Sequence, residues 1–160
     1  MTQRLAGRYV LLRPLGSGGM GNVFLALDRA TGAECALKRL RPEGLSGDPE
    51  TLRREFAVLG EMRHPLVVRV FDFGVAEDGT PYYTMEFVPG VPASEVVAAG
   101  DWRQVAWLGA QVTHGLEALH AHGIFHGDLK PSNVLVIPSP TRGRPVGVRL
   151  VDFGLAGLLG

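Results

Sequence analysis

The chain has 160 residues, 46% hydrophobic and 20% charged, which is typical of globular rather than disordered proteins. Basic and acidic residues number 16 each, so the net charge gives no reason to expect a nucleic acid or a membrane surface as partner. A single cysteine, Cys35, excludes an internal disulfide and suits a reducing, cytoplasmic location. No stretch approaches the about 18 apolar residues that a membrane span needs.

The first 87 residues predict an antiparallel sheet with one helix. Apolar alternation and turn residues predict strands over 9–15, 22–27, 34–40, about 67–73 and 81–87. Asp48 followed by Pro49 favours a helix start, since aspartate caps a helix and proline fits its first turn. Apolar residues then recur at helical spacing, so one face of a helix over 49–63 is expected to be buried.

Val88 to Pro92 contains two prolines and a glycine and predicts a linker between two parts, 1–87 and 88–160. The second part predicts a short helix near 93–99, a long helix over 102–122, and strands over 134–137 and 147–151. Gly123 is expected to end the long helix. The apolar face expected for that helix is formed by Trp102, Val105, Leu108, Val112, Leu116 and Leu119.

Glycines recur in the segment Gly16-Ser17-Gly18-Gly19-Met20-Gly21-Asn22-Val23, between two predicted strands. A dinucleotide-binding glycine turn opens a helix, so this position argues against one. Glycines in a hairpin allow backbone N–H groups to approach phosphate oxygens without a Cβ in the way. Taken alone, the segment is equally well an ordinary glycine-rich hairpin.

Three further segments follow in the chain: Lys38 after Cys35-Ala36-Leu37, the run His126-Gly127-Asp128-Leu129-Lys130-Pro131-Ser132-Asn133, and Asp152-Phe153-Gly154. Together with the glycine segment, they resemble a eukaryotic-type Ser/Thr protein kinase, particularly its bacterial members. The resemblance covers Tyr9 to Ala156. It implies an α+β protein-kinase-like fold, with a five-stranded antiparallel first lobe that carries one helix and an incomplete, mainly helical second lobe.

The resemblance also implies catalytic roles. Asp128 is expected to accept the proton of a substrate hydroxyl, and Lys130 to contact the transferred phosphate. Asn133 and Asp152 are expected to bind Mg²⁺. Lys38 is expected to neutralise the nucleotide phosphates while held by a helix carboxylate, for which Glu55 is favoured over Glu50 and Glu61.

For ATP, the resemblance implies a pocket with Met85 at its back and backbone hydrogen bonds from Glu86 and Val88 to adenine. Val23, Ala36 and Leu135 are expected to sandwich the ring. The full set of expected ATP-contacting residues is Leu15, Gly16, Ser17, Gly18, Gly19, Met20, Gly21, Val23, Ala36, Lys38, Met85, Glu86, Val88 and Leu135.

The implied activity is transfer of the ATP γ-phosphate to a Ser or Thr hydroxyl of a protein. A non-catalytic nucleotide-binding scaffold stays an open alternative. A small-molecule phosphotransferase is less favoured, since Leu129 to Asn133 follow the protein-kinase pattern closely. Nothing in the sequence indicates the protein substrate or the oligomeric state.

Two departures from the family pattern stand out. Gly127 replaces the usual arginine of His-Arg-Asp, so activity is expected not to need activation-loop phosphorylation, which phosphatase treatment would test. The sequence also ends soon after Asp152-Phe153-Gly154. Leu108, Val112, Leu116 and Leu119 of the 102–122 helix would then face water on at least one side, so the isolated chain is expected to aggregate or to need a further segment.

Overall fold

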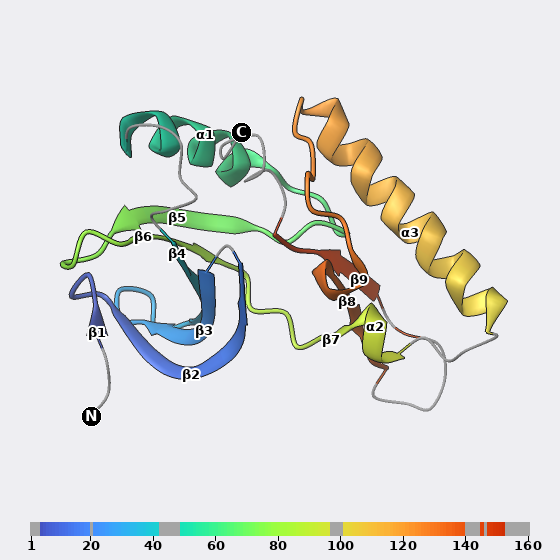
Figure 1. Cartoon of the computed structure of the whole chain (residues 1–160), viewed down its shortest axis with the longest axis horizontal. Helices are drawn as coiled ribbons and strands as arrows, with labels where there is room; N and C mark the ends of the chain where they lie inside the picture. Colours follow the sequence, from blue (N-terminus) through green and yellow to red (C-terminus); the bar gives the residue numbers. More distant parts are fainter. Residues whose placement is uncertain are drawn as a thin grey trace. The chain divides into compact units, whose positions relative to one another are not determined.

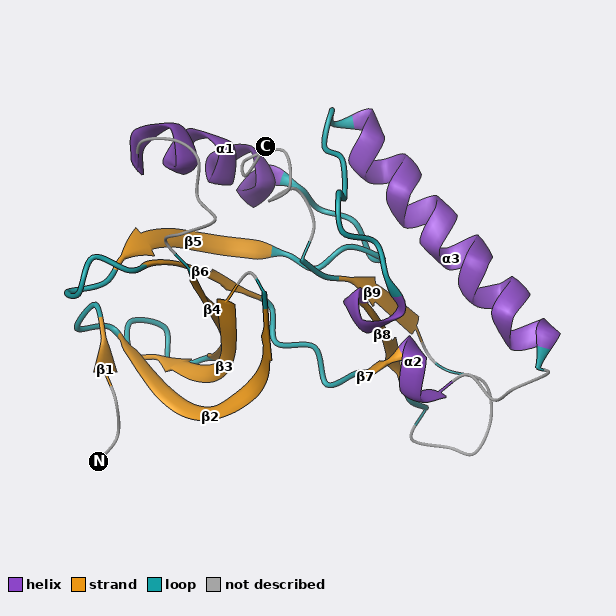
Figure 2. Cartoon of the chain, viewed as in Figure 1, coloured by secondary structure: helices purple, strands orange, loops and turns teal. Residues whose placement is uncertain are grey.

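The computed structural model describes residues 4–19, 21–41, 49–96, 101–139, 145 and 147–152, which belong to two compact units. The first unit consists mainly of Met1–Glu61 and Arg69–Phe87, and the second of Met62–Val68 and Val88–Leu158. Strands dominate the first unit, and the second contains the long helix (Figure 2).

The first unit is built on one six-stranded antiparallel sheet with the strand order β1-β2-β3-β4-β6-β5. Five of its strands match the predicted ones, and a short strand at the N-terminal edge adds a sixth. The elements are β1 (Arg4–Leu5), β2 (Tyr9–Gly18), β3 (Gly21–Asp28), β4 (Glu34–Leu40), α1 (Pro49–Glu61), β5 (Val70–Val75) and β6 (Pro81–Met85).

Strand β2 is strongly bent in Figure 1. Its pairing with β3 shifts register between Leu11 and Arg13 and again between Pro14 and Gly16. An extra residue in one strand increases the local bend and twist, so these two irregularities account for the curvature. Beyond them, Gly18 pairs with Gly21 at the tip of the hairpin.

Side chains pack on both faces of this sheet. Helix α1 packs on β5, and Phe56 from the helix stacks on Phe73 with ring centroids 4.6 Å apart. On the other face, apolar residues form a buried cluster that includes Tyr9, Leu37 and Tyr82. Cys35 belongs to this cluster, and its burial raises the pKa of the thiol to about 11. The cysteine is therefore a core residue and unreactive at neutral pH.

An arginine joins the first strands of the sheet to the last. The Arg8 guanidinium donates to both carboxylate oxygens of Asp28, at 2.8 and 2.7 Å, and to Asp72 on β5 at 2.7 Å. Asp28 is buried, and the hydrogen bonds from Arg8 hold its pKa far below the ordinary value. The Tyr9 hydroxyl also donates to Asp72, at 3.3 Å. These contacts tie β2, β3 and β5 together at one end of the sheet.

Replacing Arg8 by alanine is therefore expected to destabilise the chain by about 2 kcal/mol, because a buried carboxylate loses its charge-assisted hydrogen bonds. Since the folded-state pKa of Asp28 is depressed, this stabilisation is fully present above the unfolded value of about 4, and it is lost progressively as pH falls from there through the lower folded-state value. Urea unfolding at pH 7 and at pH 3 measures both effects. Arg13→Ala, an exposed arginine of β2, is the control. An Arg8→Ala penalty that stays equal at the two pH values would contradict the account.

The second unit has a three-stranded antiparallel sheet, in the order β7-β8-β9, and one long helix. The backbone of Val67 and Val68 also bridges to β9, through a Val68 N–H donated to the Leu150 carbonyl at 3.0 Å. That pairing explains why β5 begins at Val70 rather than near residue 67. The elements are β7 (Val91–Pro92), α2 (Ala93–Val96), α3 (Trp102–Ala121), a 3-10 turn η2 (Pro131–Asn133), β8 (Val134–Ile137) and β9 (Gly147–Leu150).

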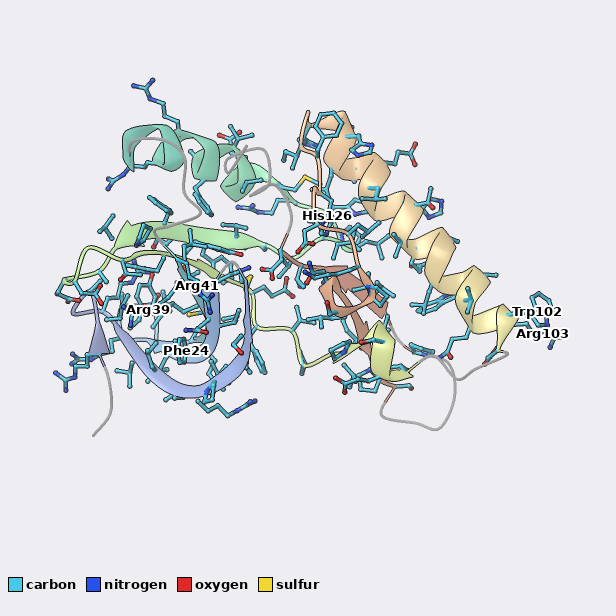
Figure 3. The ribbon with its side chains drawn as sticks, in the orientation of Figure 1. Phe24, Arg39, Arg41, Trp102, Arg103 and His126 are labelled. Carbon is cyan, nitrogen blue, oxygen red and sulfur yellow. The ribbon has the colours of Figure 1, made fainter. Side chains whose placement is uncertain are left out.

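Helix α3 begins as expected, but its first turn is exposed. Asp101 caps the helix, its carboxylate accepting the N–H of Gln104 at 3.0 Å. Leu108 and Leu119 are buried, which contradicts the expectation that they face water, whereas Trp102 is 69% and Val105 53% exposed. Figure 3 shows Trp102 and Arg103 at the end of the helix, where the guanidinium lies over the indole ring. The expected apolar face therefore does not include the first turn. No helix in the described ranges has the length and hydropathy that a membrane crossing requires.

Helix α3 approaches β9 closely at a glycine. A Cβ built at Gly115 would lie 2.6 Å from Cδ1 of Leu150, a side chain that is fully buried. Gly109, on the same helix, has open space around its Cα. Packing therefore requires glycine at position 115 but not at position 109.

Gly115→Val is expected to unfold at lower urea concentration than Gly109→Val, by about 1–3 kcal/mol in free energy, because only residue 115 would overpack the Leu150 contact. Both variants carry the same helix-propensity change, so their difference isolates the packing effect. Equal stability of the two variants would contradict the close approach.

Candidate functional site

In the first unit, the residues expected to contact a nucleotide share one face of the sheet. Ala36 and Lys38 are two positions apart on β4 and so point to the same side. Directly opposite them lie Val23 on β3, which pairs with Lys38, and Met85 on β6, which pairs with Ala36. Lys38 is only 3% exposed. A buried ammonium requires acceptors or negative charge beside it, which suits a site for phosphate.

The glycine hairpin between β2 and β3 ends at a position where only glycine fits. Gly21 has φ of +142°, and a Cβ there would lie 1.9 Å from the carbonyl oxygen of Arg39 on β4. Gly16 and Gly18 have open space, so a backbone there can meet a ligand. Leu15 and Ser17 are exposed on the same hairpin. Met20 lies outside the described residues.

Glu86 follows β6 and uses its backbone N–H within the first unit, donating it to the Arg69 carbonyl at 2.8 Å. An adenine would therefore meet this residue at its carbonyl oxygen. In the second unit, Val88, Gly90 and Leu135 lie together: a Cβ at Gly90 would be 3.0 Å from Cβ of Leu135 and 3.4 Å from Val88. Pro92 pairs with Leu135 across β7 and β8.

The segment before β8 brings together two of the predicted catalytic residues, Asp128 and Lys130, and a predicted metal ligand, Asn133. Lys130 Nζ donates to Asp128 Oδ2 at 2.6 Å. The Asn133 amide donates to the Asp128 carbonyl at 2.8 Å and to Asp128 Oδ2 at 3.2 Å. The hydrogen bond from Lys130 is the main reason why the pKa of Asp128 lies below its ordinary value. At neutral pH Asp128 is a carboxylate, the form that can accept a proton.

His126 and Gly127 directly precede Asp128, and each has a structural reason for its residue type. His126 is 3% exposed, and burial lowers the pKa of its imidazole, which is therefore neutral at pH 7. Figure 3 places it in the segment between α3 and β8. Gly127 has φ of +74°, a region that residues with a Cβ enter only with strain. Glycine therefore avoids the backbone strain that another residue would have at this position, and it also removes the arginine side chain of the family pattern.

The pairing of β8 with β9 places Asn133 and Asp152 at the same end of a hairpin. Val134 pairs with Leu150, and the Asn133 carbonyl accepts the N–H of Val151 at 3.0 Å, one residue before Asp152. Asp152 has φ of +59°, unusual for a residue other than glycine. Such an outlier points to a functional position. The described side chains contain no group of three or more His, Cys, Asp or Glu residues suited to a metal ion.

Some expected residues cannot be compared with the structure. The backbone of Glu55 is part of α1, but its side chain lies outside the described part of the chain, as do Phe153 and Gly154. The sequence pattern also missed a contact beside Lys38, between Arg39 on β4 and Asp78 in the β5–β6 turn. These two residues are far apart in sequence and belong to no motif, so no sequence pattern predicts their contact.

Residues 9–160 match the family model described as the protein kinase domain. The chain belongs to the protein kinase family. It is 41% identical over 160 residues to serine/threonine-protein kinase pkn2 of Myxococcus xanthus, covering 97% of this chain and 19% of that protein. It is also 41% identical over 165 residues to the probable serine/threonine-protein kinase PknB of Corynebacterium glutamicum, covering 98% of this chain and 24% of that protein.

The kinase domain fold is supported by solved structures as well. The PknI kinase domain of Mycobacterium tuberculosis superposes with a TM-score of 0.78 at 29% identity, covering 97% of this chain and 62% of that chain. These matches confirm the predicted family and the protein-kinase-like fold. The chain spans about a fifth to a quarter of the length of the curated relatives described above. The catalytic and binding roles that the resemblance implies for individual residues stay predictions for this chain.

The close approach at Gly21 predicts a clear difference between two glycines of the kinase hairpin. Gly21→Ala is expected to lower the free energy of unfolding by at least about 2 kcal/mol, since the new methyl meets the Arg39 backbone at a positive φ. Gly16→Ala, with open space around it, is expected to change stability little. Thermal and urea unfolding of both variants measures this, and a Gly21→Ala variant as stable as Gly16→Ala would rule out the contact.

Proposed function

We propose that this chain carries the nucleotide-binding and catalytic segments of a protein Ser/Thr kinase, which transfers the ATP γ-phosphate to a protein hydroxyl. The observation that carries the proposal is the Asp128, Lys130 and Asn133 cluster, in which an ionised carboxylate is held by an ammonium and an amide. The named relatives are serine/threonine-protein kinases, which favours this activity over other phosphotransferases.

Asp128 is the proposed proton acceptor. Lys130 and Asn133 both donate to Oδ2, so Oδ1 is the oxygen that would meet the hydroxyl of an incoming Ser or Thr. Asn133, which is buried, also holds the Asp128 backbone carbonyl, so the carboxylate is fixed in position before substrate arrives. Lys130 is half exposed and can exchange its contact with Asp128 for one with the transferred phosphate.

Asn133 and Asp152 are the proposed ligands of Mg²⁺. The Asn133 amide nitrogen is engaged by Asp128, which leaves its amide oxygen as the ligand atom, and Asp152 adds a carboxylate. Oxygen donors of these two kinds are the ligands that Mg²⁺ prefers, with phosphate oxygens and water completing the shell. When bound, the ion would neutralise phosphate charge.

The lysine content supports the same proposal. Only two of the 16 basic residues are lysines, Lys38 and Lys130, and the other basic residues are arginines. Both lysines stand at positions proposed to contact phosphate. Lysine is a compact point charge, whereas arginine presents a rigid planar fork, so the two are not interchangeable at such positions.

Asp128→Asn is expected to lower phosphate transfer to a protein substrate by about 10²- to 10⁴-fold, because the amide cannot accept the hydroxyl proton. Transfer of labelled γ-phosphate from ATP to a generic Ser/Thr-containing protein measures this, with ATP binding followed in parallel. Glu117→Gln, an exposed carboxylate of α3, is the control and should keep full transfer.

Three outcomes separate the alternatives. Transfer that depends on Asp128 supports the kinase proposal. ATP binding without any transfer by the unmodified chain would favour the nucleotide-binding scaffold. Transfer that survives Asp128→Asn unchanged would refute the assignment of the proton acceptor.

A further inference from the structure

The residue after Lys38 makes its own set of contacts on the opposite face of the sheet. Arg39 Nη2 donates to Asp78 Oδ2 and to the Thr80 hydroxyl at 3.2 Å. Both partners lie in the turn between β5 and β6, 39 and 41 residues further along the chain. Arg39 is labelled within the sheet in Figure 3. Its side chain is 21% exposed, compared with 57% for Asp78.

The turn that receives Arg39 is itself held by several hydrogen bonds. Asp78 Oδ1 accepts the N–H of Thr80 at 3.0 Å, and Gly79 takes φ of +79° between them. The Gly79 N–H donates to the Ala76 carbonyl, and the Ala76 N–H to the Thr80 carbonyl, each at 2.9 Å. A turn closed in this way is a fixed point to which a strand can be attached.

The backbone of Arg39 has a second function in the sheet. It pairs with Asn22 on β3 and with Tyr82 on β6. Its carbonyl oxygen is the atom that a Cβ at Gly21 would meet at 1.9 Å. One residue thus contacts the end of the glycine hairpin through its backbone and the β5–β6 turn through its side chain, and it directly follows the buried Lys38.

We propose that Arg39, Asp78 and Thr80 form a positioning latch that fixes β4, and with it Lys38 and Gly21, for nucleotide binding. The proposal rests on the proposed function, since it concerns the same nucleotide-binding face. Arg39 points away from that face and does not touch the nucleotide. It acts by setting where β4 lies between the glycine hairpin and the turn.

The expected effect is modest, because a partly exposed ion pair contributes little to the stability of a whole domain. Arg39→Ala is expected to weaken the binding of Mg²⁺-ATP by about two- to fivefold, because the loss of one partly exposed ion pair can cost binding no more than the small free energy that such a pair contributes. Asp78→Asn is expected to have a similar effect. It retains the Oδ1 acceptor for the Thr80 N–H, so it removes the charge and leaves the turn intact.

The test is a double-mutant cycle read out as the Kd for Mg²⁺-ATP, measured by fluorescence or calorimetric titration of the full chain. If the latch exists, the Arg39→Ala/Asp78→Asn double variant binds no more weakly than Arg39→Ala alone, since both changes break one contact. Arg41→Ala, an exposed arginine two positions further along, is the matched control and should keep the original Kd.

Each outcome decides between alternatives. A higher Kd with unchanged thermal stability supports positioning, because a merely structural role would lower the folded fraction without changing the Kd of the folded protein. Additive single-variant effects, or an unchanged Kd for Arg39→Ala, would overturn the latch while leaving the proposed function intact. Failure of the unmodified chain to bind Mg²⁺-ATP would overturn the proposed function itself. Should Arg39→Ala not fold, Asp78→Asn and Thr80→Val test the latch from the turn.

Discussion

Strand β4 is hydrogen-bonded on both sides, to β3 and to β6, and this pairing is the constraint on which the proposed nucleotide-binding face of the first unit depends. The register places Val23 and Met85 beside Lys38 and Ala36 on one face. It places Arg39 on the other face, where a salt bridge attaches the strand to a turn. Because side chains alternate along a strand, a slip of one residue would exchange the two faces and remove Lys38 from the site.

The second unit applies the same principle to the catalytic segment. The β8–β9 pairing fixes which residues stand at the end of the hairpin, and Asn133 and Asp152 both stand there. Asn133 in turn holds Asp128 by backbone and side chain. The β8–β9 pairing therefore fixes Asn133, and Asn133 in turn fixes the carboxylate that we propose as proton acceptor. Gly115 allows α3 to pack against the buried Leu150 of that ladder.

Much of this organisation could be predicted from sequence. The strands over 34–40 and 134–137 match β4 and β8 to the residue, and Pro49 and Trp102 begin helices as expected. The motifs gave the family, which the comparisons confirm. The structure brings Asp128, Lys130 and Asn133 into contact, while the catalytic and ATP-binding roles of the site residues stay predictions.

Other features could not be predicted because they depend on partners distant in the chain. The two-residue strand β1 has no pattern of its own, and nearby Ala6 and Arg8 anchor that end of the chain to Glu77, Asp28 and Asp72. Helical periodicity marks an apolar face but not which of its residues neighbouring elements cover, so it could not show that Leu108 and Leu119 are buried while Trp102 is exposed. Gly127 is explained by a backbone angle that the sequence does not display.

We propose that the buried ammonium of Lys38 binds the nucleotide phosphates. The most direct measurement is the affinity of the chain and of Lys38→Met for ATP, each with and without Mg²⁺, with thermal unfolding as the check on folding. The account predicts Mg²⁺-dependent binding that weakens at least about 30-fold in Lys38→Met, the effect of removing one partner of a buried charge pair. Equal affinity of a folded Lys38→Met variant would contradict it.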